Sequence, residues 1–396
     1  MPTPILVLNC GSSSVKYQMI DIDSEEVLAS GMVEKIGLAL GNIAHSSGGE
    51  KHTIEEPIPD HTAALGLVTR AFNTWGPTLE DVVAVGHRAV HGGERFRQTT
   101  LITDDVIEGL TDLSGLAPLH NPPGIAGITA AQKILPDVPH VAIFDTAFFS
   151  TLPPEAYTYA IDREVAEKYH IRKYGFHGTS HSYVSKKAAE FLGKDLSSIN
   201  QIICHMGNGA SISAVKGGVA VDTSMGLTPL AGLVMGTRSG DIDPGIFSYL
   251  QREAGMDSQT VDNLLNKSSG MAGMADGASD FRDLRAKIAE GDEHAKLALD
   301  VYTHRLTSYI GSYMAILGSV DTIVFTAGVG ENDNRTRADI IARLEGFGIR
   351  LDPDRNTPCN REPTIISGDD SAVTVLVVPT NEELAMARET YQVISQ

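Results

Sequence analysis

A strand–turn–strand pattern that occurs once in each half of the chain limits the possible folds more than any other feature of the sequence. Residues 5–20 consist of two apolar segments separated by a polar turn that contains Gly11. Residues 201–215 follow the same plan, with Gly207 and Gly209 in the turn. Apolar segments of strand length on both sides of a short glycine-containing turn are typical of β-hairpins. The pattern therefore predicts an internal repeat, as a duplicated domain would produce.

The rest of the chain alternates between strand-like and helix-like segments, which predicts an α/β fold. The longest predicted helix, residues 293–317, places Leu306, Ile310, Met314 and Leu317 at intervals of three or four residues. The two hairpins do not fit a simple doubly wound sheet, in which each strand is followed by a crossover. We expect further strands at residues 27–33, 82–85, 141–144, 322–326 and 373–378, and further helices at 62–72, 124–134 and 381–390.

Some segments carry little periodicity. Residues 41–59 are rich in Gly, His and Glu, and their weak periodicity leads us to expect them at the surface. Residues 222–245 are glycine-rich and equally aperiodic. A helix after residues 327–332 is expected to end at Gly346, since glycine is favoured just past a helix C-terminus.

The acidic composition excludes several classes of function. The chain has 31 lysine and arginine residues against 50 aspartate and glutamate residues, a net charge of −19. Such a chain binds nucleic acid or an anionic membrane poorly, so we expect neither as a partner. No apolar segment is long enough for a transmembrane helix, and the N-terminus lacks a signal-peptide pattern. Cys10, Cys204 and Cys359 have no CxxC spacing and predict neither disulfides nor a zinc site, so we expect a reduced, cytoplasmic protein.

Three glycine-containing turns, each after an apolar strand, point to phosphate binding. They lie at residues 9–14, 205–209 and 327–332, whereas a GxxxxGK[ST] loop is absent from the sequence. Backbone N–H groups in such turns form concavities that bind anions. One turn alone is ordinary hairpin chemistry, but three together suit a nucleotide held between two similar domains. The polar residues beside them are Asn9, Ser12, Ser14, Lys16, Asn208 and Asn332.

These segments resemble the signature motifs of the acetate kinase family over essentially the whole chain. The matching segments are residues 7–16, 83–93, 174–181, 222–229, 236–240 and 380–384. Cys10 and Met206 stand where alanine and leucine are commoner in the family, and neither change removes a polar group.

The resemblance implies an ATP-dependent acetate kinase built from two duplicated RNase H-like domains of the actin-like ATPase type, with the nucleotide in the interdomain cleft. The reversible product would be acetyl phosphate, on the way to acetyl-CoA. The implied domains are residues 1–147 plus 379–396, and residues 148–378. The resemblance also implies ATP and ADP as co-substrates, Mg²⁺ that Mn²⁺ can replace, and a homodimer.

Transfer of a phosphoryl group to a carboxylate brings two anions together and requires no general base, because the carboxylate is already ionised at neutral pH. It requires cations and in-line positioning. Arg88 and Arg238 lie in glycine-rich runs and are the best candidates, since guanidinium binds carboxylate or phosphoryl oxygens through two hydrogen bonds. By resemblance His177 stabilises the transferred phosphoryl group, and Asp145 is the active-site carboxylate. Asp145 can pair with an arginine and fix its rotamer, or help to hold Mg²⁺ through water.

The resemblance assigns the remaining site residues. Asn9 and Glu382 are implied as the metal site, although residues 381–383 also read as an ordinary helix start with an Asn cap. His181 lies one helical turn after His177 and can pack beneath it. The implied acid pocket consists of Arg88, Val90, Leu119, Phe176 and Pro229. The implied ATP-binding residues are Ser12, Ser14, Lys16, His205, Met206, Gly207, Asn208, Gly209, Asp280, Phe281, Arg282, Gly328, Val329, Gly330, Glu331 and Asn332; alternation predicts Ser12, Ser14 and Lys16 on one strand face.

Two alternatives remain open at the level of the sequence. A propionate or butyrate kinase would use the same scaffold with a larger acid pocket. An ATP-gated binding module of the actin or chaperone type would share the phosphate turns. Such a module has no need of Arg88, His177 and Arg238, whose presence favours an enzyme.

Overall fold

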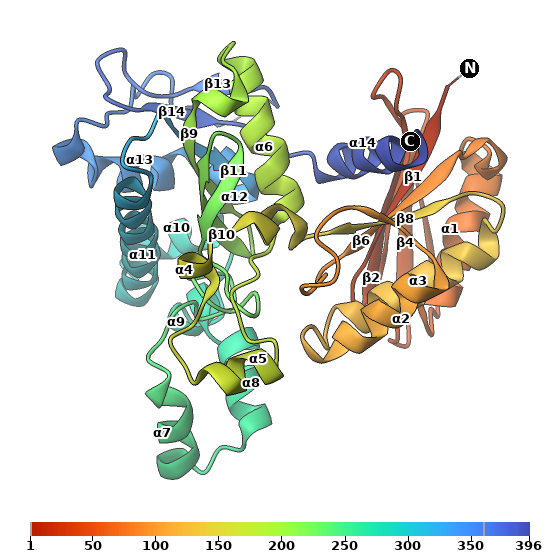
Figure 1. Cartoon of the computed structure of the whole chain (residues 1–396), viewed down its shortest axis with the longest axis horizontal. Helices are drawn as coiled ribbons and strands as arrows, with labels where there is room; N and C mark the ends of the chain where they lie inside the picture. The colour runs from red at the N-terminus through yellow and green to blue at the C-terminus, as the bar shows by residue number, and fades with distance from the viewer. Residues whose placement is uncertain (1, 359–360) are drawn as a thin grey trace. The chain divides into compact units, whose positions relative to one another are not determined.

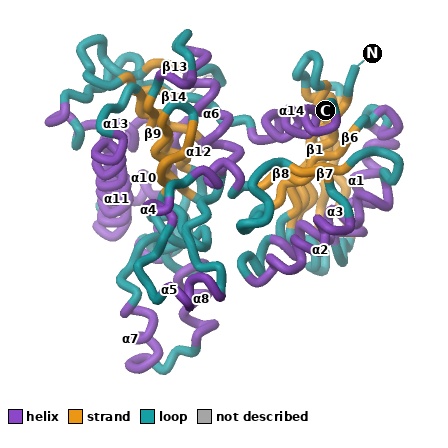
Figure 2. Tube along the Cα trace, in the orientation of Figure 1, coloured by secondary structure: helices purple, strands orange, loops and turns teal. Residues whose placement is uncertain are grey.

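The computed structural model describes residues 2–358 and 361–396, and the chain divides into two compact units. Unit 1 comprises Met1–Ser150 and Asn381–Gln396, and unit 2 comprises Thr151–Thr380. Each unit contains one mixed β-sheet with helices packed against it, so the predicted α/β class is confirmed (Figures 1 and 2).

The sheet of unit 1 has eight strands in the order β5-β4-β3-β2-β1-β6-β8-β7. Strands β1 to β5 are antiparallel to their neighbours, as a meander, while β6 and β8 run parallel to β1. The strands are β1 (Pro4–Cys10), β2 (Ser14–Asp21), β3 (Val27–Glu34), β4 (Gly41–Ser47), β5 (Glu50–Glu56), β6 (Ala84–Ala89), β7 (Thr100–Leu101) and β8 (His140–Phe144).

Most of residues 41–59 form the β4–β5 hairpin, two strands that the weak periodicity of this segment did not predict. In β4 the buried positions alternate as Gly41, Ile43 and His45, so one face carries a glycine and a histidine in place of large apolar residues. Because Gly41 and His45 are not large apolar residues, the two-residue period of this strand is hidden in the sequence. His45 is buried because the hydroxyl of Tyr17 lies 2.7 Å from its Nδ1.

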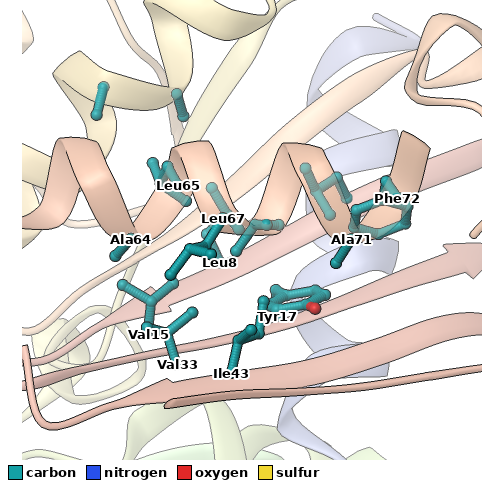
Figure 3. Close-up of a cluster of buried hydrophobic side chains, with 14 of the residues drawn as sticks. Leu8, Val15, Tyr17, Val33, Ile43, Ala64, Leu65, Leu67, Ala71 and Phe72 are labelled. Carbon is teal, nitrogen blue, oxygen red and sulfur yellow. The ribbon is translucent and has the colours of Figure 1, made fainter. Parts of the chain in front are cut away.

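Helices cover both faces of this sheet. On one face lie α1 (His61–Trp75) and α3 (Asn121–Ile134), with α2 (Asp104–Asp112) packed on α3. Buried side chains of α1, such as Leu67 and Phe72, interlock with Val15 and Tyr17 of the sheet (Figure 3). The opposite face holds α14 (Glu382–Ile394), which contacts β1, β6 and β8. Gly86 of β6 permits this approach, because a methyl group there would lie 2.3 Å from the hydroxyl of Thr390.

The sheet of unit 2 repeats the central strand order of unit 1, which confirms the predicted internal repeat. Its order is β11-β10-β9-β12-β14-β13. As with β2, β1, β6 and β8, β10 is antiparallel to β9, and β12 and β14 run parallel to β9. The strands are β9 (Asn200–Met206), β10 (Ala210–Lys216), β11 (Val219–Thr223), β12 (Thr322–Thr326), β13 (Thr364–Ile365) and β14 (Thr374–Val377).

The longest helix of unit 2, α11 (Glu293–Leu317), has the predicted bounds. It begins where the Asp292 side chain accepts hydrogen bonds from the backbone of residues 294 and 295. The other helices of this unit are α4 (Pro154–Tyr157), α5 (Arg163–Lys168), α6 (Gly178–Phe191), α7 (Gly245–Ala254), α8 (Ser258–Lys267), α9 (Gly270–Met274), α10 (Phe281–Ala289), α12 (Ala327–Asn332) and α13 (Asn334–Ala342).

Two predictions for the end of unit 2 are wrong. Residues 327–332 form the short helix α12 instead of a turn. Gly346 does not end a helix, because α13 already ends at Ala342, and the glycine in left-handed conformation is Gly348, with φ of 76°. Propensity alone does not distinguish two nearby glycines as helix ends.

In the described part of the chain, no helix combines the length and apolar character needed to cross a membrane. Cys10 and Cys204 are buried and not in disulfides. Cys359 lies outside the described residues.

Candidate functional site

In unit 1, the fold brings Arg88 and Asp145 together at the carboxyl ends of two neighbouring parallel strands. Arg88 is the penultimate residue of β6, and Asp145 directly follows β8. The backbone N–H of Asp145 donates to the carbonyl of Ala89 at 3.0 Å and fixes this end of the pair. Arg88 then donates through Nε to Oδ1 (2.9 Å) and through Nη2 to Oδ2 (2.6 Å) of Asp145.

Arg88 and Asp145 form a bidentate ion pair that is largely shielded from water. Asp145 is 1% exposed, whereas the side chain of Arg88 keeps 22% of its surface exposed. Burial opposes the charge on Arg88, but the attraction and hydrogen bonds of Asp145 outweigh it and raise the pKa of the guanidinium. Arg88 is therefore a permanent cation in a fixed rotamer, with part of its guanidinium still open to a ligand.

A small cavity of about 100 Å³ surrounds this exposed part of Arg88. Asn9 and Lys16, which are paired across β1 and β2, form one wall, and Glu382 and Glu383 of α14 form another. The Lys16 ammonium forms an ion pair with Glu383. Lys16, predicted to contact phosphate, is thus already paired, and Glu383 is a site residue that the sequence reading missed.

Burial and several neighbouring charges act on the carboxylate of Glu382. Burial raises its pKa, Arg88 lowers it, and the nearby charges of Asp145 and Glu383 raise it further. Asn381 caps this helix as predicted, since its Oδ1 accepts from the N–H of Leu384 at 3.0 Å. The helix-start explanation therefore accounts for Asn381, while Glu382 in addition faces the cavity beside Arg88.

The first phosphate turn differs in part from the prediction. Strand β2 begins at Ser14, so Ser14 and Lys16 share a strand face, but Ser12 lies in the turn and the prediction that alternation places it there is wrong. The turn is closed by a hydrogen bond from the N–H of Gly11 to the carbonyl of Ser14, at 2.8 Å. Neither Ser12 nor Ser14 lines the cavity around Arg88.

In unit 2, His177 and Arg238 converge on the turn between β9 and β10. A methyl group built at Gly209 of that turn would lie 3.4 Å from Cε1 and Nε2 of His177 and 3.7 Å from Nη1 of Arg238. His177 stands at the N-terminus of α6 with φ of 60°, a conformation that non-glycine residues adopt at an energetic cost. Such strain is typical of residues held in place for function.

A backbone carbonyl holds Arg238 in place. Its Nη1 donates to the carbonyl of Pro229 at 3.1 Å, and burial lowers the pKa of its guanidinium. Gly236, two residues earlier, donates its N–H to the carbonyl of Asn208 at 2.9 Å. Glycine at 236 leaves room for the Asn208 side chain, because a methyl group there would lie 2.0 Å from its Oδ1. The loop of Arg238 is thereby attached to the β9–β10 turn.

A pocket of about 890 Å³ opens beside the same turn, which is within the size range of ligand sites in proteins. Eight predicted ATP-binding residues line it, from three distant segments: Gly207, Asn208, Asp280, Phe281, Arg282, Gly328, Val329 and Asn332. The sequence reading missed other lining residues: Gly236, Ser279, Arg285, Tyr302, Asp333, Asn334 and Arg335. Asp333 could have been found as the aspartate that caps α13.

At the rim of the pocket, Asp280 and Arg282 pair with each other. Arg282 donates through Nη2 to Oδ2 of Asp280 at 2.9 Å, and its N–H donates to Oδ1 as a helix cap. These hydrogen bonds and the charge of Arg282 lower the pKa of Asp280 to about 2. The side chain of Arg282 is 91% exposed and can reorient toward a ligand.

The other predicted ATP-binding residues of unit 2 lie outside the lining of the pocket: His205, Met206, Gly209, Gly330 and Glu331. Met206 is fully buried, and His205 stacks on His177 with ring centres 4.3 Å apart. Glu331 accepts a hydrogen bond from the N–H of Thr380 at 3.1 Å, and burial raises its pKa.

The four apolar side chains of the predicted acid pocket belong to two units. Val90 and Leu119 belong to unit 1, where Val90 is half-buried and Leu119 is 52% exposed. Phe176 and Pro229 belong to unit 2. Phe176 is 1% exposed, so its ring packs in the core, whereas Pro229 contributes the carbonyl that binds Arg238. A common acid pocket for these residues stays a prediction.

The repeated sheet and the nucleotide-sized pocket are those of a phosphotransferase with the actin-like ATPase type of fold. The chain belongs to the acetokinase family, which its residues 4–388 match. It is 55% identical over 387 residues to the acetate kinase of Clavibacter michiganensis subsp. michiganensis, covering 97% of this chain and 98% of that one.

Two solved structures match the fold closely. The crystal structure of Porphyromonas gingivalis acetate kinase has a TM-score of 0.94 and 43% identity, covering 99% of this chain and 100% of that one. The crystal structure of a propionate kinase from Francisella tularensis subsp. tularensis has a TM-score of 0.92 and 42% identity, covering 98% and 99%. The similarity of these two values means that the fold itself does not separate the two acids.

Proposed function

We propose that this protein transfers the γ-phosphoryl group of ATP to acetate, reversibly and by direct in-line displacement, giving acetyl phosphate and ADP. The observation that carries the proposal is the convergence of His177 and Arg238 on Gly209, at the turn whose Gly207 and Asn208 line the large pocket. A nucleotide in this pocket with its phosphates at the turn would have an imidazole and a guanidinium beside the group to be transferred.

In this proposal Arg238 and His177 neutralise the charge that develops on the phosphoryl oxygens. Positioned donors of this kind contribute more in a desolvated site than in water, and Arg238 is desolvated enough for burial to lower its pKa. His177 presents its Nε2 edge to the same place. The two side chains require no movement of their own at the moment of transfer.

Asp145 acts on Arg88 and takes no proton from acetate. Both its oxygens are engaged by the guanidinium of Arg88, and acetate is already ionised. Asp145 is therefore a positioning residue that fixes Arg88, whose exposed side binds an anion. The partly exposed guanidinium suits a carboxylate or a phosphoryl oxygen.

Glu382 and Asn9, which both line the cavity beside Arg88, would hold Mg²⁺. The donor set fits this ion, which binds through one or two carboxylates when a nucleotide is its other ligand. Asp145 is paired with Arg88 and Glu383 with Lys16, so Glu382 is the cavity carboxylate left for a cation among the described residues. No trio of His, Cys, Asp or Glu among them forms a metal cluster of its own. Bound Mg²⁺ would neutralise charge on the β- and γ-phosphates.

A propionate kinase is the second candidate, supported by the likeness to the Francisella structure. The curated relatives point to acetate, and one methylene changes discrimination by only about 1–3 kcal/mol. The test is ADP release with ATP and, in parallel, acetate, propionate or butyrate. We expect the highest kcat/KM with acetate; a higher value with propionate would assign the second function, and ADP release independent of any acid would refute both. A homodimer and a cytoplasmic location stay predictions.

A further inference from the structure

A continuous chain of hydrogen bonds leads from the core of unit 2 to the inner edge of His177. Ser213 Oγ lies 2.8 Å from Nδ1 of His181. His181 Nε2 lies 2.8 Å from Oγ of Ser211. Ser211 Oγ in turn lies 2.9 Å from Nδ1 of His177. Ser211, Ser213 and His181 have no exposed surface, and His177 alone reaches the site.

The chemistry of one hydroxyl couples the two histidines. Ser211 has a single proton, so it donates to one of the two imidazole nitrogens and must accept an N–H from the other. If Ser211 donates to His177, then His177 carries its own proton on Nε2, and His181 donates its Nε2–H to Ser211. The reverse arrangement places the proton of a neutral His177 on Nδ1 and leaves a lone pair at Nε2.

His181 is held in the neutral state that this coupling requires. Burial lowers its pKa well below the ordinary value, and the neighbouring His205 lowers it further. A neutral imidazole has one N–H only. In the arrangement that places this proton of His181 on Nε2, its Nδ1 accepts the hydroxyl proton of Ser213, and the hydrogen bonds run in one direction from Ser213 to His177.

We propose that Ser211, supported by His181 and Ser213, is a positioning residue that keeps His177 in the Nε2–H tautomer and aims that proton at the phosphoryl group. The proposal rests on the proposed function of His177. A lone pair at Nε2 would repel a phosphoryl oxygen, whereas an N–H donates to it. The Nδ1 edge faces Ser211 and the Nε2 edge faces Gly209 and Arg238, so the two ring edges are already assigned by geometry.

The kinetic test compares Ser211→Ala with Ser185→Ala. Ser185 is also fully buried, lies on α6 and hydrogen-bonds Gln201 instead of a histidine, so it controls for the loss of a buried hydroxyl. We expect Ser211→Ala to lower kcat about tenfold with KM for ATP and acetate unchanged, since small misplacement of a reacting group is costly. Ser185→Ala should retain wild-type kcat.

Substitution of His177 separates the two levels of the proposal. His177→Ala should lower kcat by about 10², and adding Ser211→Ala to it should cause no further loss. A wild-type kcat for His177→Ala would refute the role of His177 and, with it, the positioning role of Ser211. If His177→Ala lowers kcat by about 10² and Ser211→Ala still lowers kcat by its full factor in that background, the role of His177 stands and the positioning role of Ser211 is refuted.

The spectroscopic test reads the tautomer directly. In protein with ¹⁵N-labelled histidine, correlation spectra of the imidazole nitrogens distinguish Nε2–H from Nδ1–H. We expect His177 to give the Nε2–H pattern in the wild type and in Ser185→Ala, and a mixture in Ser211→Ala. An Nδ1–H pattern in the wild type, or the same pattern in all three proteins, would overturn the proposal.

Discussion

Arg88 and Arg238 have different surroundings, and the same substitution should therefore affect them differently. Either Arg88→Ala or Arg238→Ala should lower kcat by on the order of 10³, because charge in the transition state loses a partner. ATP binding should weaken far less. Only Arg88→Ala should also destabilise the fold strongly, since it leaves Asp145 as a buried carboxylate without its cation.

The two stability losses can be worked out from the contacts. Removing one partner of a buried ion pair costs about 3–5 kcal/mol, because the other charge stays desolvated. Asp145 is 1% exposed, so this range applies to Arg88→Ala. Arg238→Ala removes a hydrogen bond to the carbonyl of Pro229, worth about 0.5–1.5 kcal/mol. Replacing both Arg88 by Met and Asp145 by Leu should restore most of the stability without restoring activity.

Urea unfolding and steady-state kinetics test both parts. Trp75, the single tryptophan, lies at the end of α1 in unit 1 and stacks on His52, so its fluorescence reports the unit that contains Arg88. We expect Arg88→Ala to lower the free energy of unfolding of this unit, and Arg238→Ala to leave it unchanged. Equal stability of the two variants would refute the ion-pair reasoning, and near-normal turnover in both would refute the proposed mechanism.

Three further outcomes are expected. Glu382→Ala should raise the Mg²⁺ concentration needed for half-maximal activity in a metal titration; an unchanged requirement, with a stability loss of about 0.3–1 kcal/mol, would make it a helix-start residue only. Burial and the neighbouring His140 lower the pKa of His87, so below pH ~6.5 the unfolded chain binds more protons than the folded chain. The free energy of unfolding should therefore fall with decreasing pH, by up to ~1.4 kcal/mol per pH unit for this group. Urea titrations from about pH 7.5 to 5 should show a weaker pH dependence of this free energy in His87→Gln, and an equal pH dependence would contradict the reasoning. Val90→Ala should raise the propionate-to-acetate ratio of kcat/KM about tenfold if Val90 bounds the methyl group, whereas equal losses for both acids would make it general core.

Local patterns in the sequence were sufficient to predict the most regular helices and strands and the internal repeat. The hairpins at residues 5–20 and 201–215 and the helix at 293–317 each have a clear period and clear ends, so their own residues determine them. Asp145 was correctly expected at the end of a buried strand for the same reason. Where the period was disturbed, as by Gly41 and His45 in β4, no strand was predicted.

The site depends on contacts that local patterns do not contain. The bond between Arg88 and Asp145 arises because β6 and β8 are parallel neighbours, and Lys16 meets Glu383 because α14 returns to the sheet of unit 1. Ser211 has no motif of its own; its importance comes from lying between two imidazoles that approach from α6. Pairings of this kind are non-local and become visible only in three dimensions.

The most direct test of the central claim is to follow ³¹P NMR spectra of ATP and Mg²⁺ with and without acetate, in the wild type and in Arg238→Ala. The account predicts that acetyl phosphate and ADP appear in equal amounts in the wild type only when acetate is present, and that both signals grow on the order of 10³ more slowly in Arg238→Ala. Release of inorganic phosphate at the same rate without acetate, or an Arg238→Ala variant as fast as the wild type, would contradict it.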